Sequence, residues 1–124
     1  MHDNHAYQRV YWGGAAIALL ADVALREAGG SLDAAMRALH RCCAATLRVW
    51  PSEQILQAMD ESGASRGYPR LEALSGPILR SAAFPDLTPI YRKLGVSMVN
   101  GEPTLDESAP IAPLRRAIFT QPRP

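Results

Sequence analysis

Proline is absent from the first 50 residues of this 124-residue chain, and all ten prolines lie from Pro51 onward. Because proline lacks a backbone N–H and breaks helix interiors, only the first part can hold long uninterrupted helices. The chain has 20 alanines and 14 leucines against 15 valines, isoleucines and threonines together, a balance that favours helix over sheet. We therefore predict a mainly all-α fold: a small multi-helix bundle with a helical hairpin core, an irregular C-terminal segment and room for one short strand.

The length of the chain fits one domain, because a chain of this size buries roughly two-thirds of the surface that its unfolded form exposes. Neither an internal repeat nor a low-complexity tract divides it. We predict a single helical domain over residues 1–119, with its core in residues 7–96, followed by a disordered tail at residues 120–124.

Charge and hydropathy exclude several partners. Thirteen basic and twelve acidic residues give a net charge of +1, and no basic run is longer than Arg115-Arg116, so we predict no nucleic-acid binding. The most apolar stretch, residues 11–21, ends at Asp22 and is too short to cross a bilayer, which predicts no membrane partner. The first 24 residues have one arginine and no clean cleavage site for a signal peptidase. A cytoplasmic location is the resulting prediction.

Helical signals are strongest in the first 63 residues. A first helix begins between Tyr7 and Tyr11 and runs to Ala28, where Gly29-Gly30 ends it, and an ion pair is expected between Asp22 and Arg26. Residues 14–21 are apolar on every side of this helix, so we expect other elements to cover them completely. Ser31 is the predicted N-cap of a second helix, which Trp50-Pro51-Ser52 ends. The same tripeptide caps a third helix, whose apolar residues Ile55, Leu56 and Met59 recur at helical spacing before Gly63 ends it.

Shorter elements are predicted beyond Gly63. Two helical pieces, Leu71–Leu74 and Pro77–Ala83, are predicted with a break at Ser75-Gly76, followed by a helix Leu87–Leu94 that Gly95 closes. A strand Val96–Val99 is predicted to lead into an Asn100-Gly101 turn. The final helical segment, Ile111–Phe119, is predicted to pack by Ile111, Leu114, Ile118 and Phe119.

The residue types that bind metals do not form a strong motif. His2 and His5 lie three residues apart near the N-terminus, and the chain contains neither HExxH nor CxxC. His40 is predicted at the surface of the second helix. Cys42 and Cys43 are adjacent, and because neighbours on a helix point about 100° apart, we predict that they are reduced thiols that fill the core. We predict no metal or cofactor site in this chain.

One longer pattern points to a family. It runs from Tyr11-Trp12-Gly13-Gly14-Ala15-Ala16 through Asp22 and Leu25-Arg26 to Gly30-Ser31-Leu32-Asp33. The pattern resembles the catalytic domain of glycyl aminopeptidase-like metallopeptidases, which are gluzincins related to the zinc aminopeptidases, in the helical part that follows the zinc-binding motif. The similarity continues through Met36-Arg37-Ala38-Leu39, and downstream Ser62-Gly63, Leu74-Ser75-Gly76 and Leu94-Gly95-Val96 fall in the family's usual order. The likeness therefore covers residues 7–96.

The resemblance implies a catalytic role for Tyr11 as a hydrogen-bond donor to the transition state, because the family's tyrosine at this place binds the tetrahedral oxyanion. Gly13 departs from the pattern, because the zinc aminopeptidases commonly have lysine at this position, directly before the glycine that Gly14 matches. From the residues alone, the favoured interpretation of Tyr11 is an aromatic side chain at a helix start with its hydroxyl in water.

The family's zinc ligands precede this tyrosine, and only ten residues precede Tyr11 here. We therefore expect a C-terminal helical subdomain or fragment of a zinc metallopeptidase, with no peptidase activity of its own. Zinc and a peptide substrate belong only to an intact family member. The expected partners are a zinc-binding subdomain or a second copy of the chain, because an all-apolar helix requires a neighbour. The alternative is a small helical protein–protein interaction module without a catalytic role.

Overall fold

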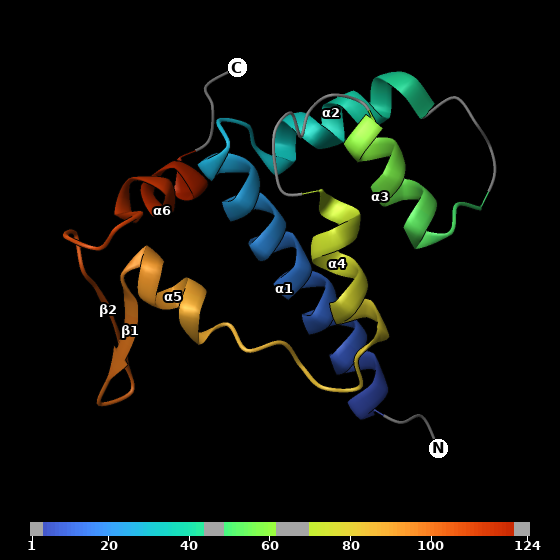
Figure 1. The fold of residues 1–124 in the computed structure, drawn as a ribbon. Helices are drawn as coiled ribbons and strands as arrows, with labels where there is room; N and C mark the ends of the chain where they lie inside the picture. Colours follow the sequence, from blue (N-terminus) through green and yellow to red (C-terminus); the bar gives the residue numbers. More distant parts are fainter. Residues whose placement is uncertain (1–3, 44–48, 62–69, 121–124) are drawn as a thin grey trace. The chain divides into compact units, whose positions relative to one another are not determined.

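The computed structural model describes residues 4–43, 49–61 and 70–120, with side chains from Gln8 onward (Figure 1). The chain divides into two compact units, Met1–Pro85 and Asp86–Pro124, and each is described by itself. The fold is mainly helical with one small antiparallel sheet, which confirms the predicted fold class. The single domain over residues 1–119 stays a prediction, and residues 121–124 of the expected disordered tail lie outside the described part.

Unit 1 contains four helices: α1 (Asn4–Glu27), α2 (Leu32–Cys43), α3 (Ser52–Glu61) and α4 (Leu71–Arg80). Helix α1 packs against α2 and α4, while α3 packs against α2 and α4. Helix α1 begins at Asn4, three residues before Tyr7, which was the earliest predicted start. Gly63, the predicted end of the third helix, lies outside the described residues.

The end of α1 is fixed by glycine, as predicted. Gly29 has a φ of +90°, and its N–H donates to the Arg26 carbonyl at 3.0 Å while the N–H of Gly30 donates to the Leu25 carbonyl at 2.8 Å. This pair of bonds satisfies carbonyls that the helix end leaves without partners, and the left-handed backbone at Gly29 favours a residue without a Cβ.

Asp22 couples α1 to the start of α2. One of its carboxylate oxygens accepts the Leu32 N–H at 2.9 Å, and the other accepts the Arg26 Nε–H at 2.9 Å, which confirms the predicted ion pair. Ser31, the residue directly before α2, also caps this helix, because its hydroxyl oxygen accepts the Ala34 N–H at 3.1 Å. Two of the N–H groups that a helix start leaves open are thus satisfied by side chains.

Asp60 performs the same task between α3 and α4. Its side chain is 1% exposed, and its two oxygens accept the backbone N–H groups of Leu71 at 2.7 Å and Glu72 at 3.2 Å. The Nε of Arg70 lies 4.0 Å from this carboxylate. A buried negative charge at the positive end of α4 is therefore both hydrogen-bonded and favourably placed relative to the helix dipole.

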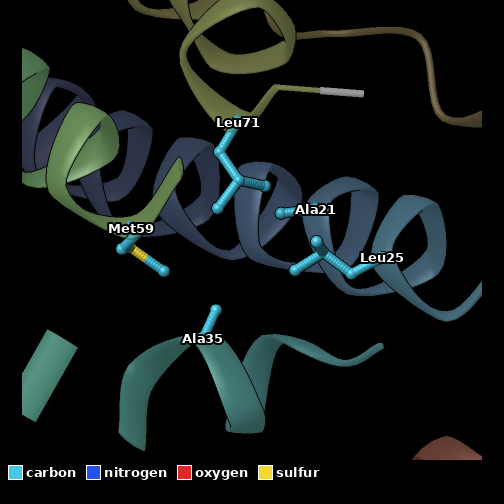
Figure 2. Packing of buried hydrophobic residues seen from close by; sticks show 5 residues of the cluster. All are labelled: Ala21, Leu25, Ala35, Met59 and Leu71. Atoms are coloured by element: carbon cyan, nitrogen blue, oxygen red, sulfur yellow. The ribbon is translucent and has the colours of Figure 1, made fainter. Parts of the chain in front are cut away.

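The core of unit 1 lies where all four helices meet. Figure 2 shows Ala21 and Leu25 of α1, Ala35 of α2, Met59 of α3 and Leu71 of α4 pointing toward one another. Partly buried side chains pack around them: Leu32, Leu39, Ile55, Leu56 and Leu74. The small alanines on α1 and α2 allow these helices to approach closely, while the longer side chains fill the remaining space.

The prediction of two helical pieces broken at Ser75-Gly76 is wrong, because α4 is one helix with Pro77 in its interior. The buried side of α4 carries Ser75 and Gly76, whereas Pro77 is exposed. Proline cannot donate to the carbonyl of Ala73, four residues earlier, but Ala73 is also exposed, so water can satisfy that carbonyl. Packing of the buried side thus outweighs a helix defect that faces solvent.

Replacing Asp60 with alanine should lower the free energy of unfolding by about 2 kcal/mol, because two buried N–H groups of α4 lose their acceptor. The matched control is Asp33→Ala, which removes an exposed aspartate paired with Arg37 and should cost about 0.5 kcal/mol or less. Urea denaturation followed by circular dichroism measures both values. Equal losses in the two variants would contradict the capping role of Asp60.

Unit 2 contains α5 (Thr88–Leu94), β1 (Val96–Val99), β2 (Glu102–Leu105) and α6 (Ala112–Phe119). The strands form an antiparallel hairpin around Asn100 and Gly101, whose φ angles of 51° and 80° suit a two-residue turn. The strand and turn predictions are confirmed, and β2 is an additional strand. Val99 and Glu102 are the pair that closes the turn, and Met98 and Pro103 are the next pair. Because hydrogen-bonded and non-hydrogen-bonded pairs alternate along an antiparallel ladder, the Pro103 nitrogen points away from β1.

Arg115 joins the elements of unit 2. It is 3% exposed, and its Nη1 donates to the carbonyl oxygens of Leu94 at 2.7 Å, Gly95 at 3.3 Å and Asp106 at 3.1 Å, while its Nη2 is paired with the Glu107 carboxylate. A buried cation at the end of α5 satisfies carbonyls that the helix leaves open and interacts favourably with the helix dipole.

The connection after β2 is also ordered by hydrogen bonds. The hydroxyl and the backbone N–H of Ser108 donate to one carboxylate oxygen of Asp106, at 2.6 and 2.9 Å. These two bonds favour the ionised carboxylate and lower the pKa of Asp106 below its ordinary value.

The predicted packing of α6 is correct in part. Ile111, Leu114 and Ile118 are half-buried, but Phe119 is 82% exposed, so its assignment to the packed side is wrong. The most buried residues of this segment are instead Ala112 and Arg115. The helix turns Ala112 and Arg115 inward because the Arg115 guanidinium bonds to carbonyls, an interaction that apolar periodicity does not reveal.

Gly95→Ala should destabilise unit 2 by about 3 kcal/mol, because the added Cβ overlaps the Asp106 carbonyl oxygen, lies 2.6 Å from the Ala109 Cβ and imposes a side chain at a φ of +77°. Gly101→Ala is the matched control: its φ is +80°, but its Cβ would meet no atom within 4 Å, so it should cost about 1 kcal/mol. Amide hydrogen exchange of β1 measures both. Similar losses would show that the close contact at Gly95 is unimportant.

Candidate functional site

Tyr11, the predicted site residue, lies on α1 and is 62% exposed. Its ring contacts Trp12 edge to face, with the ring centroids 5.2 Å apart and the planes at 86°. Trp12 is itself 58% exposed. The two rings therefore form an aromatic surface on the N-terminal half of α1, and the catalytic role of Tyr11 stays a prediction.

The middle of α1 is less covered than its sequence predicts. Ala16 and Ala21 are buried, but Gly14, Ala15 and Ala18 are exposed, so the expectation of complete cover over residues 14–21 is wrong. The core cluster of unit 1 uses only the C-terminal half of α1. We define the α1 face as Tyr11, Ala15 and Ala18, which are exposed at the i, i+4 and i+7 positions of one helix side.

A second feature of unit 1 is a groove beside α1. Helices α1 and α4 lie side by side (Figure 1), and a hollow of about 590 Å³ opens between the N-terminal half of α1, the end of α4 and residues 81–85. Its lining is mostly apolar: Val10, Gly13, Gly14 and Ile17 from α1, Ile78 and Leu79 from α4, and then Ser81, Ala83, Phe84 and Pro85. We call this hollow the α1–α4 groove.

Arg9 is the charged residue of the groove lining. Its Nη2 donates to the Ser81 carbonyl at 2.7 Å, which is the only hydrogen bond of Arg9 to the described residues. A guanidinium has five N–H donors, so four are available at the exposed Arg9 side chain. The bond to Ser81 fixes this cation at the groove wall.

Two glycines keep the wall of the groove open. A Cβ added at Gly13 or Gly14 would meet no atom within 4 Å, so their place in the helix is not dictated by close packing within the described residues. Glycine in a helix interior costs about 1 kcal/mol relative to alanine. The open space that they leave belongs to the groove and to the exposed side of α1.

The metal-ligating residue types stay dispersed. Among the described side chains, in residues 8–43, 49–61 and 70–120, no three of His, Cys, Asp or Glu come together as a metal site would require. His40 is exposed, as predicted, and His2 lies outside the described residues. None of the described helices is both long enough and apolar enough to cross a membrane.

The cysteine prediction is wrong on both counts. Cys42 and Cys43 form a disulfide with their Cα atoms 3.8 Å apart, and Cys42 is exposed instead of filling the core. The prediction assumed that both residues lie inside a continuing helix, where adjacent side chains diverge. They are the last two residues of α2, so helical positions did not keep the two sulfur atoms apart.

Comparisons with protein-family models, curated proteins and solved structures found no match to this chain. The resemblance to glycyl aminopeptidase-like metallopeptidases therefore stays a prediction.

Sequence reasoning missed the α1–α4 groove. Arg9 and Ser81 are 72 residues apart, and no local pattern links them. The available signal was the Gly13-Gly14 pair, because each glycine inside a helical run costs about 1 kcal/mol relative to alanine. That signal locates one wall of the groove but does not reveal the other.

Proposed function

We propose that this chain is a non-catalytic helical interaction module that pairs with a second copy of itself through the α1 face. The observation that carries this proposal is the exposure of Tyr11, Ala15 and Ala18 on one side of α1, next to the exposed ring of Trp12. Contiguous exposed apolar surface of this kind is typical of association sites.

The chemistry of the α1 face suits a second copy. A two-fold symmetric pair brings the same face of each copy together, so like charges would oppose one another. The α1 face carries no charge, and the next residue along it, Asp22, is already bonded to Arg26 and Leu32. The short side chains of Ala15 and Ala18 allow close approach of two helices, while the aromatic rings add contact area at one end.

Ala18→Glu should weaken dimer formation by about tenfold or more, because pairing would bury an unpartnered carboxylate. Ala73→Glu is the matched control, since Ala73 is an exposed alanine on α4 outside the α1 face. Sedimentation equilibrium over a range of micromolar concentrations measures the dissociation constants. The proposal expects Ala73→Glu to match the unmodified chain, and an unmodified chain that stays monomeric at every concentration would refute the proposal.

A second candidate is the helical subdomain of a glycyl aminopeptidase-like zinc metallopeptidase. It is supported by the sequence pattern around Tyr11 and by the exposed position of the Tyr11 side chain on a helix. In this interpretation the chain forms the substrate-side wall, and a zinc-binding subdomain supplies the metal and the catalytic base. A phenolic O–H held by a helix is preorganised to stabilise an oxyanion.

Tyr11→Phe separates the two candidates. In an intact zinc peptidase it should lower kcat by about 100-fold with little change in stability, because one oxyanion donor is lost. In a self-pairing module it should leave the dissociation constant nearly unchanged, since the exposed hydroxyl is removed but the ring remains. The purified chain alone should show no zinc-dependent peptide hydrolysis in a fluorogenic assay, and such hydrolysis would contradict both candidates.

A further inference from the structure

The α1–α4 groove has the character of a small-molecule site. Its volume of about 590 Å³ falls within the range of about 300–1,000 Å³ that is typical of ligand clefts. Its lining residues have apolar side chains or are glycines, except for Ser81 and Arg9. Apolar walls with one or two fixed polar groups are what an amphiphilic ligand requires, because the walls bind its body and the polar groups set its orientation.

Arg9 selects the charge of the ligand. The groove lining contains this one cation and no acidic side chain, so an anionic head group would be attracted and a cationic one repelled. The bond from Arg9 to Ser81 holds the guanidinium in place, which reduces the entropy lost when a ligand binds. The planar donors that remain match the geometry of a carboxylate.

The open wall at Gly13 favours a slender apolar body. An alkyl chain can lie against backbone at Gly13 and against the side chains of Ile17, Ile78 and Leu79, where it would be removed from water. We propose that the α1–α4 groove binds a medium-chain fatty acid, with the alkyl chain along these apolar walls and the carboxylate at Arg9. The residues that line this groove are not those of the α1 face, and the proposal does not depend on self-pairing.

Isothermal titration of the full chain tests the site, with dodecanoate as the probe below its critical micelle concentration and dodecanol as its uncharged counterpart. Dodecanoate should bind saturably at one site per chain, and dodecanol roughly five- to tenfold more weakly, because it lacks the charged partner for Arg9. Equal affinities for the two probes would overturn the role of Arg9.

Two pairs of variants locate the ligand. Arg9→Gln should weaken dodecanoate roughly five- to tenfold and leave dodecanol unchanged, whereas Arg41→Gln, at an exposed arginine on α2, should change neither. Gly13→Leu should abolish binding of both probes, since its side chain would occupy the groove without a clash at Cβ. Ala73→Leu, on the exposed side of α4, should bind both probes normally.

Circular dichroism of each variant separates lost binding from lost folding, and Gly13→Leu should be at least as helical as the unmodified chain. Undiminished dodecanoate binding in Gly13→Leu would overturn the proposal, as would absence of binding in the unmodified chain. If Gly13→Leu instead prevented dimer formation while dodecanoate never bound, the groove would be a protein contact, and the fatty-acid proposal would fall while self-pairing stood.

Discussion

The arrangement of unit 1 depends on carboxylates that reach from one helix to the start of the next. Asp22 on α1 bonds the first N–H of α2, and Asp60 on α3 bonds the first two N–H groups of α4. Each carboxylate satisfies donors that a helix start must otherwise expose, and each fixes where the following helix begins relative to the preceding one. The core cluster lies between helices whose starts are held by these bonds. Directional bonds and nondirectional burial therefore support the same arrangement.

The sequence correctly predicted the helix ends and the turn that depend on residues close to one another in the chain. Gly29, Ser31 and Gly95 marked helix ends correctly, and the Asn100-Gly101 turn was recognised, because each acts through its own backbone or through residues within one turn of a helix. The failures occur where distant residues decide. Helix α4 continues through Pro77 because its opposite side is buried, and Arg115 is buried because carbonyls of three other residues surround it. Neither effect has a signature in the periodicity of apolar residues.

The candidate sites show the same division. The sequence identified residues 14–21 of α1 as a stretch with no polar side, and Tyr11, Ala15 and Ala18 are exposed on one side of this part of the helix. The α1–α4 groove could not be predicted, since it requires Arg9 and the segment after α4 to meet. The disulfide of Cys42 and Cys43 was missed because the prediction took the divergence of adjacent helical side chains as decisive.

Pro103 limits how the hairpin of unit 2 can associate. Its nitrogen lies on the outer edge of β2 and has no hydrogen to donate, so a further strand cannot complete a regular ladder along that edge. Open-ended stacking of hairpins needs two usable edges per copy, one for each neighbour. Pro103 therefore disfavours edge-to-edge stacking of this hairpin into an open-ended assembly.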